Sequence, residues 1–530
     1  MTKEILERQF KDFRLRFDNY KIKMESKEIA MYEEVGALIH ALSDEKKITA
    51  ILQREIASLT AENDLIREER DEYKKGLEKC NEEIKRLHSM LNKDSSNSSK
   101  PPSTDGFRKV VNQREKSQRP SGGQIGHKGH YLKLPENIDE LVEKGVAEIN
   151  VVDHTNGRED YISRWTLDVK VKVIVTEHRF SNIEDLPDNM NNMVTYGDNI
   201  KAMTVLLSNE GIVAEERLTS FFSELTEGAV NPSVATIESF MEQFAKKLPE
   251  ELGSIRADLL EGKVINTDDT PMRSTQKLKY GKPGEEPVLI TAKNTTFDVT
   301  LRNYSNEQST IYTVNPQKDK EGVERDNILP KFKRTVAHDH ESKFYDYGTA
   351  HGTCNDHLTR DLKGLNVLEN VAWADQMRSF MLEMNDHKKC DLEKEVKACD
   401  KDLLKDYDNR YDTLLADGWA AYSTLKKDEL GEDGLRKMLN RLRDYKECHL
   451  LFMKDYDVPF TNGLSERDLR PAKTRQKVSG CFRSWNGIKI YADVRSFIST
   501  AKKRHINLFN AISSIFKGIP VFAAGAVEQN

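Results

Sequence analysis

The stretch V-I-N-T-D-D-T-P-M-R, Val264 to Arg273, decides how the rest of the chain is interpreted. A short apolar run ends in Asp268 and Asp269, followed by Thr270 and Pro271, which predicts a buried strand that delivers carboxylates to its exposed C-terminal end. Two adjacent acids at a strand end more often belong to a turn or a helix cap than to a catalytic site. The catalytic interpretation therefore depends on partners elsewhere in the sequence.

Two later segments supply such partners. R-T-V-A-H-D-H, Arg334 to His340, is a second brief apolar run and carries Asp339 at its end. T-N-G-L-S-E-R-D-L-R-P, Thr461 to Pro471, places Glu466 in the first turns of a predicted helix, behind turn residues. Three carboxylates from separate elements can hold two Mg²⁺ ions roughly 3.5 to 4 Å apart, as two-metal phosphoryl chemistry requires. The three acids therefore indicate that chemistry.

Several ordered motifs resemble transposases of the bacterial insertion-sequence 66 family. They are T-D-D-T-P-M-R, H-D-H-E-S-K-F-Y-D-Y-G-T-A-H-G-T-C-N-D-H-L-T-R-D-L-K and N-G-L-S-E-R-D-L-R-P-A-K-T-R-Q-K-V-S-G-C-F-R-S, with N-S-S-K-P-P-S and G-G-Q-I-G-H-K-G upstream. The resemblance spans most of the chain after about residue 90. It implies an α/β ribonuclease-H-like catalytic domain, a mixed sheet flanked by helices, with a DDE triad of Asp268, Asp339 and Glu466 that is both catalytic and metal-binding.

The resemblance also implies an activity. Such a transposase cleaves DNA at the ends of an insertion element and joins the freed 3′ hydroxyl to target DNA, using two Mg²⁺ ions or Mn²⁺ as a substitute. Element-end DNA, target DNA and small helper proteins of the same element would be its partners. A nuclease of the same fold without strand transfer is one alternative, and a domesticated or inactive relative acting as a coiled-coil DNA-binding protein is another. The three intact acids favour an active enzyme.

Other residues are weighed against the same family pattern. The family usually has Asp-Glu-Thr where this chain has Asp-Asp-Thr, so Asp269 is a weaker candidate. The resemblance implies that Cys354 and His357, a Cys-x-x-His signature after the second acid, pack against and orient the Asp339 region. With His351 they have zinc-ligand chemistry, but in a helical segment three residues so spaced do not point one way.

A competing second acid is rejected on the order of the motifs. D-G-W-A-A-Y contains Asp417 and imitates the family's second-aspartate motif. The family places its Cys-x-x-His signature after that aspartate. Cys354 follows Asp339 but precedes Asp417, so we assign the second position to Asp339.

Composition limits the class of protein. The chain has 530 residues, 37% hydrophobic and 32% charged, so it can bury more than one core. It has no apolar run of about 18 residues and a highly charged N-terminus, so neither a membrane span nor a signal peptide is expected. The six cysteines show no framework spacing, as expected of reduced thiols. We expect a cytoplasmic, nucleoid-associated bacterial protein whose net charge of -6 conceals basic segments.

Residues 1–93 are predicted to form a long helical coiled coil. Apolar positions recur in steps of four and three from residue 52. The seam consists of Leu52, Ile56, Leu59, Asn63, Ile66, Arg70, Tyr73, Leu77, Cys80, Ile84, Leu87 and Leu91. A buried asparagine such as Asn63 often fixes a two-stranded pairing, so we predict a homodimer through residues 52–91. A hairpin folding back on residues 5–42 is the alternative.

Two small segments follow the coiled coil. Residues 94–133 are rich in Ser, Pro and Gly and predict a flexible basic linker that follows phosphates, although a merely solvated linker is the alternative. Its candidate DNA-binding residues are Lys100, Arg108, Lys109, Arg114, Lys116 and Lys128. Residues 134–195 alternate as strands between Val146 and His178, which predicts a ribbon-like domain, and they contain no cysteine to bind zinc.

The remaining boundaries follow from the motifs. Residues 196–260 are predicted to be helical and to include a possible DNA-binding helix-turn-helix, although an ordinary bundle has the same pattern. The catalytic domain covers 261–367, where P-V-L-I-T-A and F-D-V-T-L-R-N-Y are further strand candidates, and 459–515; a helical insertion separates them at 368–458 and a tail covers 516–530. Basic residues after Glu466 are expected to grip phosphates, namely Arg467, Arg470, Lys473 and Arg475.

Overall fold

The computed structural model describes residues 3–40, 47–93, 97–98, 134–154, 160, 162–185, 187, 190, 192–281, 285–425 and 431–522. The chain divides into two compact units. The first unit contains residues 1–107, 337–340 and 350–462, and the second contains residues 108–336, 341–349 and 463–530. The basic residues predicted in the linker, from Lys100 to Lys128, lie outside the described residues, so that prediction stays untested.

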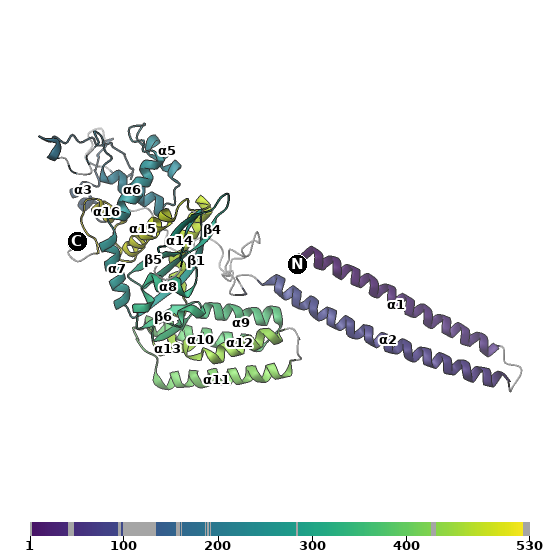
Figure 1. Ribbon diagram of the computed structural model, residues 1–530. Helices are drawn as coiled ribbons and strands as arrows, with labels where there is room; N and C mark the ends of the chain where they lie inside the picture. The colour runs from purple at the N-terminus through teal and green to yellow at the C-terminus, as the bar shows by residue number, and fades with distance from the viewer. Residues whose placement is uncertain are drawn as a thin grey trace. The chain divides into compact units, whose positions relative to one another are not determined.

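A mixed sheet carries the catalytic candidates. Three antiparallel strands of the second unit, β5 (Thr310–Asn315), β4 (Phe297–Ser305) and β1 (Val264–Ser274), lie side by side in Figure 1. The full strand order is β5-β4-β1-β6-β7, where β6 is Thr335–His338 and β7 is Ala350–Thr353. The unit boundary passes through β6, after Val336. The order makes β1, with its two adjacent acids, the central strand.

β1 does not end at the acids, so the predicted strand end at Asp268 is wrong. Pairing with β4 continues without a break from Asn266 opposite Ser305 to Ser274 opposite Phe297. Past Pro271, which has no backbone N–H, Phe482 pairs with the strand: its N–H donates to the Arg273 carbonyl and its carbonyl accepts from Thr275, both at 2.9 Å. This cross-strand pairing outweighs the turn preference of Asp-Asp-Thr-Pro, and it places Asp268 in mid-strand.

The two faces of the central strands pack against different partners. Met272, Val299 and Leu301 join a core with Leu469 of α14 (Gly463–Ser479) and Ile488 of α15 (Trp485–Lys503). The other face packs Ile265, Tyr304 and Ile311 against Ile255 and Leu259 of α7 (Pro249–Glu261), and it is also covered by α8 (Lys320–Asp326). Because successive side chains of a strand alternate between faces, Asp268 shares the Met272 face and Asp269 shares the Ile265 face.

Residues 196–260 form four helices, α4 (Asp198–Asn209), α5 (Glu215–Leu225), α6 (Val234–Lys246) and α7. The break after α5 falls at Glu227 and Gly228, whose φ angles are 51° and 83°, and α6 begins behind Ser233, whose side chain accepts a hydrogen bond from the Thr236 N–H. A core of α4 and α6 side chains packs against α15 and α16 (Leu508–Phe516). These contacts are those of an ordinary bundle, and DNA binding by this segment stays a prediction.

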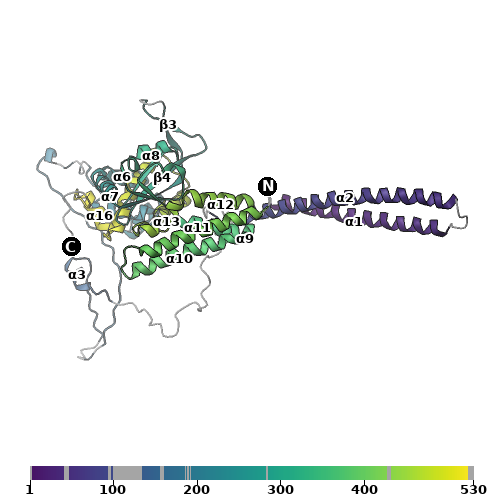
Figure 2. The ribbon, with the colours of Figure 1, turned by 90° about the horizontal axis from the view of Figure 1, so that it is seen from below.

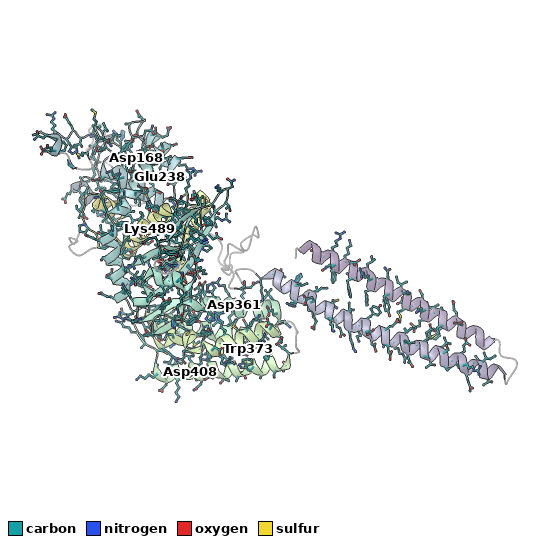
Figure 3. All side chains as sticks on the ribbon, in the orientation of Figure 1. Asp168, Glu238, Asp361, Trp373, Asp408 and Lys489 are labelled. Carbon is teal, nitrogen blue, oxygen red and sulfur yellow. The ribbon has the colours of Figure 1, made fainter. Side chains whose placement is uncertain are left out.

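The first unit contains a bundle of five helices, α9 (Asn355–Glu369), α10 (Trp373–Glu393), α11 (Lys401–Thr424), α12 (Glu432–Asp444) and α13 (Lys446–Lys454). Figure 2 shows the long helices α10 and α11 alongside each other. Trp373, labelled in Figure 3, donates its indole N–H to the Leu414 carbonyl at 2.7 Å, and Tyr411 donates its hydroxyl to the Leu442 carbonyl at 3.0 Å. The helices of the predicted insertion are thus joined by buried polar contacts as well as apolar packing.

The N-terminal helices α1 (Lys3–His40) and α2 (Lys47–Asn92) form an antiparallel hairpin within one chain (Figure 1). The rings of Tyr20 and Tyr73 lie 4.4 Å apart between their centroids. Among the described side chains of the two helices none is buried, and the seam positions Leu59, Asn63 and Ile66 are only half-buried. The single chain therefore forms the hairpin that was the alternative to a dimeric coiled coil. Pairing of two chains stays a prediction.

The described residues between 134 and 195 do not form the predicted ribbon. Among the described residues of this segment there is no strand, only α3 (Ile138–Glu143) and the short helix η2 (Ile183–Asp185). Val151, Val169 and Val175 are 86%, 87% and 91% exposed. Alternation supplies one apolar face, but a strand also needs a neighbour to pair with and a surface to pack on, and the described segment packs on neither.

The first strand candidate after β1 forms a strand, but not in the main sheet. P-V-L-I-T-A contains β3 (Val288–Thr291), which pairs with β2 (Gln276–Lys279) in a separate two-stranded sheet rather than in the main one. F-D-V-T-L-R-N-Y forms β4, as predicted, whereas β5 and β7 were not predicted. Within the described residues, no helix is both long enough and apolar enough to cross a membrane.

Candidate active site

Asp268 lies half-buried in the middle of β1, opposite Asn303 of β4. Its backbone N–H donates to the Asn303 side-chain oxygen at 3.2 Å, and its own carboxylate accepts from the Asp269 N–H at 2.7 Å. The first contact holds the backbone of Asp268 and the second restrains its carboxylate, so the strand limits the direction in which the side chain points.

Glu466 lies in the first turn of α14, beside a second contact of the same asparagine. The Asn303 side-chain N–H donates to the Ser465 carbonyl at 3.1 Å, and the Ser465 hydroxyl donates to the Asn303 side-chain oxygen at 2.5 Å. One buried amide thus bonds both the backbone of Asp268 and Ser465, the residue before Glu466. The sequence does not single out Asn303, because β4 contains other polar residues that are buried as well, namely Thr300, Arg302 and Ser305.

Asp468 fixes the start of α14 on the sheet. Its carboxylate accepts hydrogen bonds from the hydroxyls of Ser305 and Thr310 at 2.7 and 2.8 Å, and from the Lys503 ammonium at 2.8 Å. The Tyr312 hydroxyl donates to the Asp468 carbonyl at 2.6 Å. Because these partners come from β4, β5 and α15, the first turn of α14 cannot shift without breaking several hydrogen bonds.

Asp339 lies in the first unit, directly after β6, and is half-buried. Its carboxylate accepts from the Asn462 side-chain N–H at 3.0 Å and lies 3.6 Å from His357 Nδ1. The ligand atoms of Asp339, Cys354 and His357 all lie within 4.8 Å of one another. The Cys-x-x-His signature is therefore in contact with the second acid, where it can orient that carboxylate.

His351 lies apart from this group. The expectation that His351, Cys354 and His357 all belong to one helical segment was wrong. His351 is on β7, Cys354 is the cap residue before α9, and only His357 is on the helix, whereas all three were expected in a helical segment. His351 Nδ1 lies 3.4 Å from Nε2 of His338 on β6. The strand-to-helix junction thus separates His351 from the other two residues.

Asp269 is fully enclosed on the opposite face of the sheet from Asp268. Its side chain is 0% exposed and accepts ion pairs from Lys343 at 2.6 Å, Lys318 at 2.9 Å and Arg302 at 3.4 Å. A carboxylate surrounded by three cations is not free to bind metal, so these ion pairs give Asp269 a structural role on the face opposite Asp268. Asp417 is exposed on α11 of the first unit.

The four basic residues predicted to grip DNA near Glu466 have different surroundings. Arg467 and Arg470 are exposed on α14. Lys473 is half-buried and donates to the Pro271 carbonyl at 3.0 Å; burial lowers its pKa, although Asp268 and Asp298 oppose that shift. Arg475 donates to the Ser208 carbonyl at 3.0 Å, and its guanidinium lies 5.2 Å from the centre of the Tyr491 ring, so its contacts are those of packing.

The sequence was compared with models of known families. Residues 194–490 match the family described as "Transposase IS66 family". Residues 25–133 match a "Family of unknown function (DUF6444)". No curated protein matches the chain.

Comparison with solved structures gives similarity to complexes of the Mos1 transposase. The "Crystal structure of the Mos1 mariner paired end complex with Mn" is 12% identical, with 48% of this chain and 97% of that chain covered and a TM-score of 0.11. The "Crystal structure of the Mos1 Strand Transfer Complex" is 12% identical over 51% of this chain and 82% of that chain, with a TM-score of 0.12. Since the match at 194–490 covers more than half of the 530 residues, this chain belongs to the IS66 family of transposases, enzymes that cleave DNA and transfer strands.

Proposed function

We propose that this transposase acts through Asp268, Asp339 and Glu466, which bind divalent metal ions at the scissile phosphate of an element end. The observation that carries the proposal is the short segment from Asn462 to Glu466. At its beginning, Asn462 donates to the Asp339 carboxylate at 3.0 Å. Near its end, Ser465 bonds Asn303, the amide that also bonds the Asp268 backbone. This run of five residues thus contacts the carboxylate of Asp339 through Asn462, and through Ser465 it contacts the amide that holds the Asp268 backbone.

The strand order supports the ribonuclease-H-like fold that this proposal requires. In chain order the strands of the main sheet are β1, β4, β5, β6 and β7, and they lie in the order β5-β4-β1-β6-β7. The first strand is thus central, with the antiparallel β4 and β5 on one side. In this arrangement the first acid lies on the central strand and the second follows the fourth strand of the sheet.

The donor set fits hard divalent cations. Asp268, Asp339 and Glu466 are all half-buried, so their carboxylates can share an ion with water and phosphate oxygens, as Mg²⁺ requires. The imidazole of His357 and the thiol of Cys354 beside Asp339 are softer donors, which Mg²⁺ and Mn²⁺ do not favour, so the proposal assigns metal binding to the carboxylates. When bound, two ions would activate the attacking oxygen and stabilise the leaving oxygen.

The residues around the acids would hold the site in shape. Asn303 fixes the backbone of β1 and the first turn of α14, and His357 restrains the Asp339 carboxylate. Arg467 and Arg470, exposed on the helix that carries Glu466, would bind phosphates of the element end. Lys473 would supply a third cation, whereas Arg475 is already engaged in packing.

Self-association through the N-terminal hairpin is part of the same proposal. Two helices alone cannot enclose a core, and each exposes apolar side chains along its length. Phe10, Phe17 and Ile29 of α1 are 45%, 45% and 59% exposed, and Ile56 and Leu65 of α2 are 61% and 62% exposed. A second hairpin packed on these residues would cover them and would couple two transposase chains.

The triad is tested by shape-conserving substitutions. Asp268→Asn, Asp339→Asn and Glu466→Gln should each lower cleavage and joining of an element end by about 10³-fold or more, since positioning and charge stabilisation supply most of this chemistry. Duplex affinity and folding should change little. Asp417→Asn, on an exposed helix face of the first unit, is the matched control and should retain activity.

Full joining activity in any one of the three variants would reject the assignment. Asp269→Ala is not a fair control, although its adjacent position suggests it, because it would leave Lys343 and Arg302 without their enclosed partner. Loss of activity in that variant would follow from a broken ion network and would say nothing about metal binding.

A further inference from the structure

The enclosed carboxylate of Asp269 joins three separate parts of the second unit. Arg302 comes from β4, Lys318 from the connection after β5, and Lys343 from the short helix η5 (Ser342–Phe344) between β6 and β7. Lys343 is the more enclosed of the two lysines: its side chain is 11% exposed, whereas that of Lys318 is 49% exposed. A single acid therefore anchors two connections to the central strand.

Glu341 completes the network. Its carboxylate contacts the ammonium groups of both Lys318 and Lys343. Although burial alone would lower it, the carboxylates of Asp269 and Glu341 raise the pKa of Lys318, so the lysine stays charged. Three acids, Asp269, Glu341 and Asp326, thus balance Arg302 and the two lysines in one connected cluster.

The segment from Glu341 to Lys343 begins two residues after Asp339. His340, the residue between, has a φ of 61°, a left-handed conformation that only a well-held backbone keeps for a residue with a side chain. Downstream, Phe344 is buried in the core and the Tyr347 hydroxyl donates to Glu324 at 2.6 Å. The segment that follows Asp339 in the chain is thus held in the second unit by Lys343 on one side and by Phe344 and Tyr347 on the other.

We propose that Asp269 is a positioning residue for metal binding: by holding Lys343, and with it Glu341 and Lys318, it fixes to β1 the segment that follows Asp339 in the chain. The proposal rests on the function proposed above for Asp268 and Asp339. It gives the two adjacent acids of β1 different tasks on opposite faces of the sheet. Asp268 would bind the ion, and Asp269 would hold the segment that follows a second ligand, Asp339, in the chain.

The test measures Mn²⁺ binding to the full chain by calorimetry, without DNA and without turnover. Asp269→Asn keeps the shape of the side chain but removes its charge, and it should raise the Kd for Mn²⁺ at least about tenfold. Asp269→Glu keeps the charge and should restore affinity to within about threefold of the wild type. Lys343→Met should weaken binding as Asp269→Asn does, and the double variant should be no weaker than either single variant, because both remove the same contact.

Asp326→Asn is the matched control for a merely structural effect. Asp326 is in the same cluster, bonded to Arg302 at 2.6 Å and to the Tyr304 hydroxyl at 2.7 Å, but no contact joins it to Lys343 or Glu341. It should lower the melting temperature as much as Asp269→Asn while leaving the Mn²⁺ affinity of the folded protein unchanged. Equal losses of affinity in the two variants, or wild-type affinity in Asp269→Asn, would overturn the proposal.

Asp268→Asn separates this proposal from the one on which it rests. If Asp268→Asn leaves Mn²⁺ binding unchanged, the metal site itself is wrongly placed. If Asp268→Asn abolishes binding and Asp269→Asn does not affect it, only the positioning role is wrong. Should Asp269→Asn fail to fold by circular dichroism, Lys343→Met and Lys343→Arg decide the matter, since a positioning contact predicts weaker binding in the first and near wild-type binding in the second.

Discussion

The buried cluster around Arg302 and the exposed N-terminal hairpin use the same charged residue types in opposite ways. Arg302 and Asp326 pair at 2.6 Å with side chains 0% and 3% exposed. Arg16 and Asp12 of α1 pair at 2.7 Å with side chains 79% and 58% exposed. An exposed pair contributes little because water and salt screen it, whereas removing one partner of a buried pair strands a charge without water. Two ion pairs of similar length are therefore expected to differ widely in what the loss of one partner does to the stability of the protein.

The difference also separates the tasks of the two regions. In the second unit, charges that cannot reorganise hold a sheet and its turns in one arrangement, which a metal site requires. The hairpin has no buried side chain among its described residues, so its fold depends on what else packs against it. We therefore expect the catalytic region to be rigid by itself and the hairpin to gain order from a second chain.

The largest effect should come from substitution in the buried cluster. Asp326→Ala removes the partner of Arg302 and of the Tyr304 hydroxyl, and it should lower the free energy of unfolding by about 3 to 5 kcal/mol. Asp12→Ala, the matched change in the hairpin, should leave it unchanged within error. Urea denaturation of the two variants measures both values, and equal effects would remove the distinction between the two regions.

A smaller effect on stability, but a clear one on mass, should follow removal of the hairpin. Deleting residues 1–88 leaves Lys93 and its ion pair with Glu369 in place, so the helical bundle keeps that contact. Light scattering should then give the mass of one shortened chain, 530 − 88 = 442 residues, which is less than half the mass of a full-length dimer, with the melting temperature of the remainder nearly unchanged. Leu65→Lys, which places a charge at a position that is 62% exposed in one chain, should dissociate the full-length protein in the same way.

A full-length protein that is already monomeric would contradict this role of the hairpin, and so would a deleted protein of undiminished mass. Replacing Asn63 distinguishes the two possible pairings. Asn63 is half-buried within the hairpin of one chain, so Asn63→Leu should stabilise that hairpin. In a parallel two-stranded coil, the same change should alter register or oligomer state instead.

Local signals in the sequence located the elements but not their extent. The run from Val264 predicted β1, and Asn-Pro-Ser before Val234 predicted the start of α6, because strand periodicity and capping are local properties. The sequence did not predict that β1 continues through Pro271, because cross-strand pairs with β4 decide it. The described valines from Val146 to Val175 show the opposite error. Their alternation predicted strands, but without a neighbouring strand to pair with they form none.

The candidate site shows the same division. The motifs placed Asp268, Asp339 and Glu466, and the signature containing Cys354 and His357 was found beside the second acid. The roles of Asn303 and Asp269 depend on residues far away in the sequence, such as Ser465 and Lys343. No local pattern reports which face of a strand will be enclosed by charges from other elements, so only the family resemblance ranked Asp268 above Asp269.

The central claim is that three acids distant in the sequence hold the same metal ions, and oxidative cleavage of the polypeptide tests it directly. Fe²⁺ replaces Mg²⁺ or Mn²⁺ at carboxylate sites, and with ascorbate and peroxide it cuts the backbone only next to where it is bound. We expect cuts close to residues 268, 339 and 466, competed by Mn²⁺ and absent in Asp268→Asn. Cuts confined to the neighbourhood of Asp339, Cys354 and His357, or a pattern that Asp268→Asn does not change, would contradict the shared site.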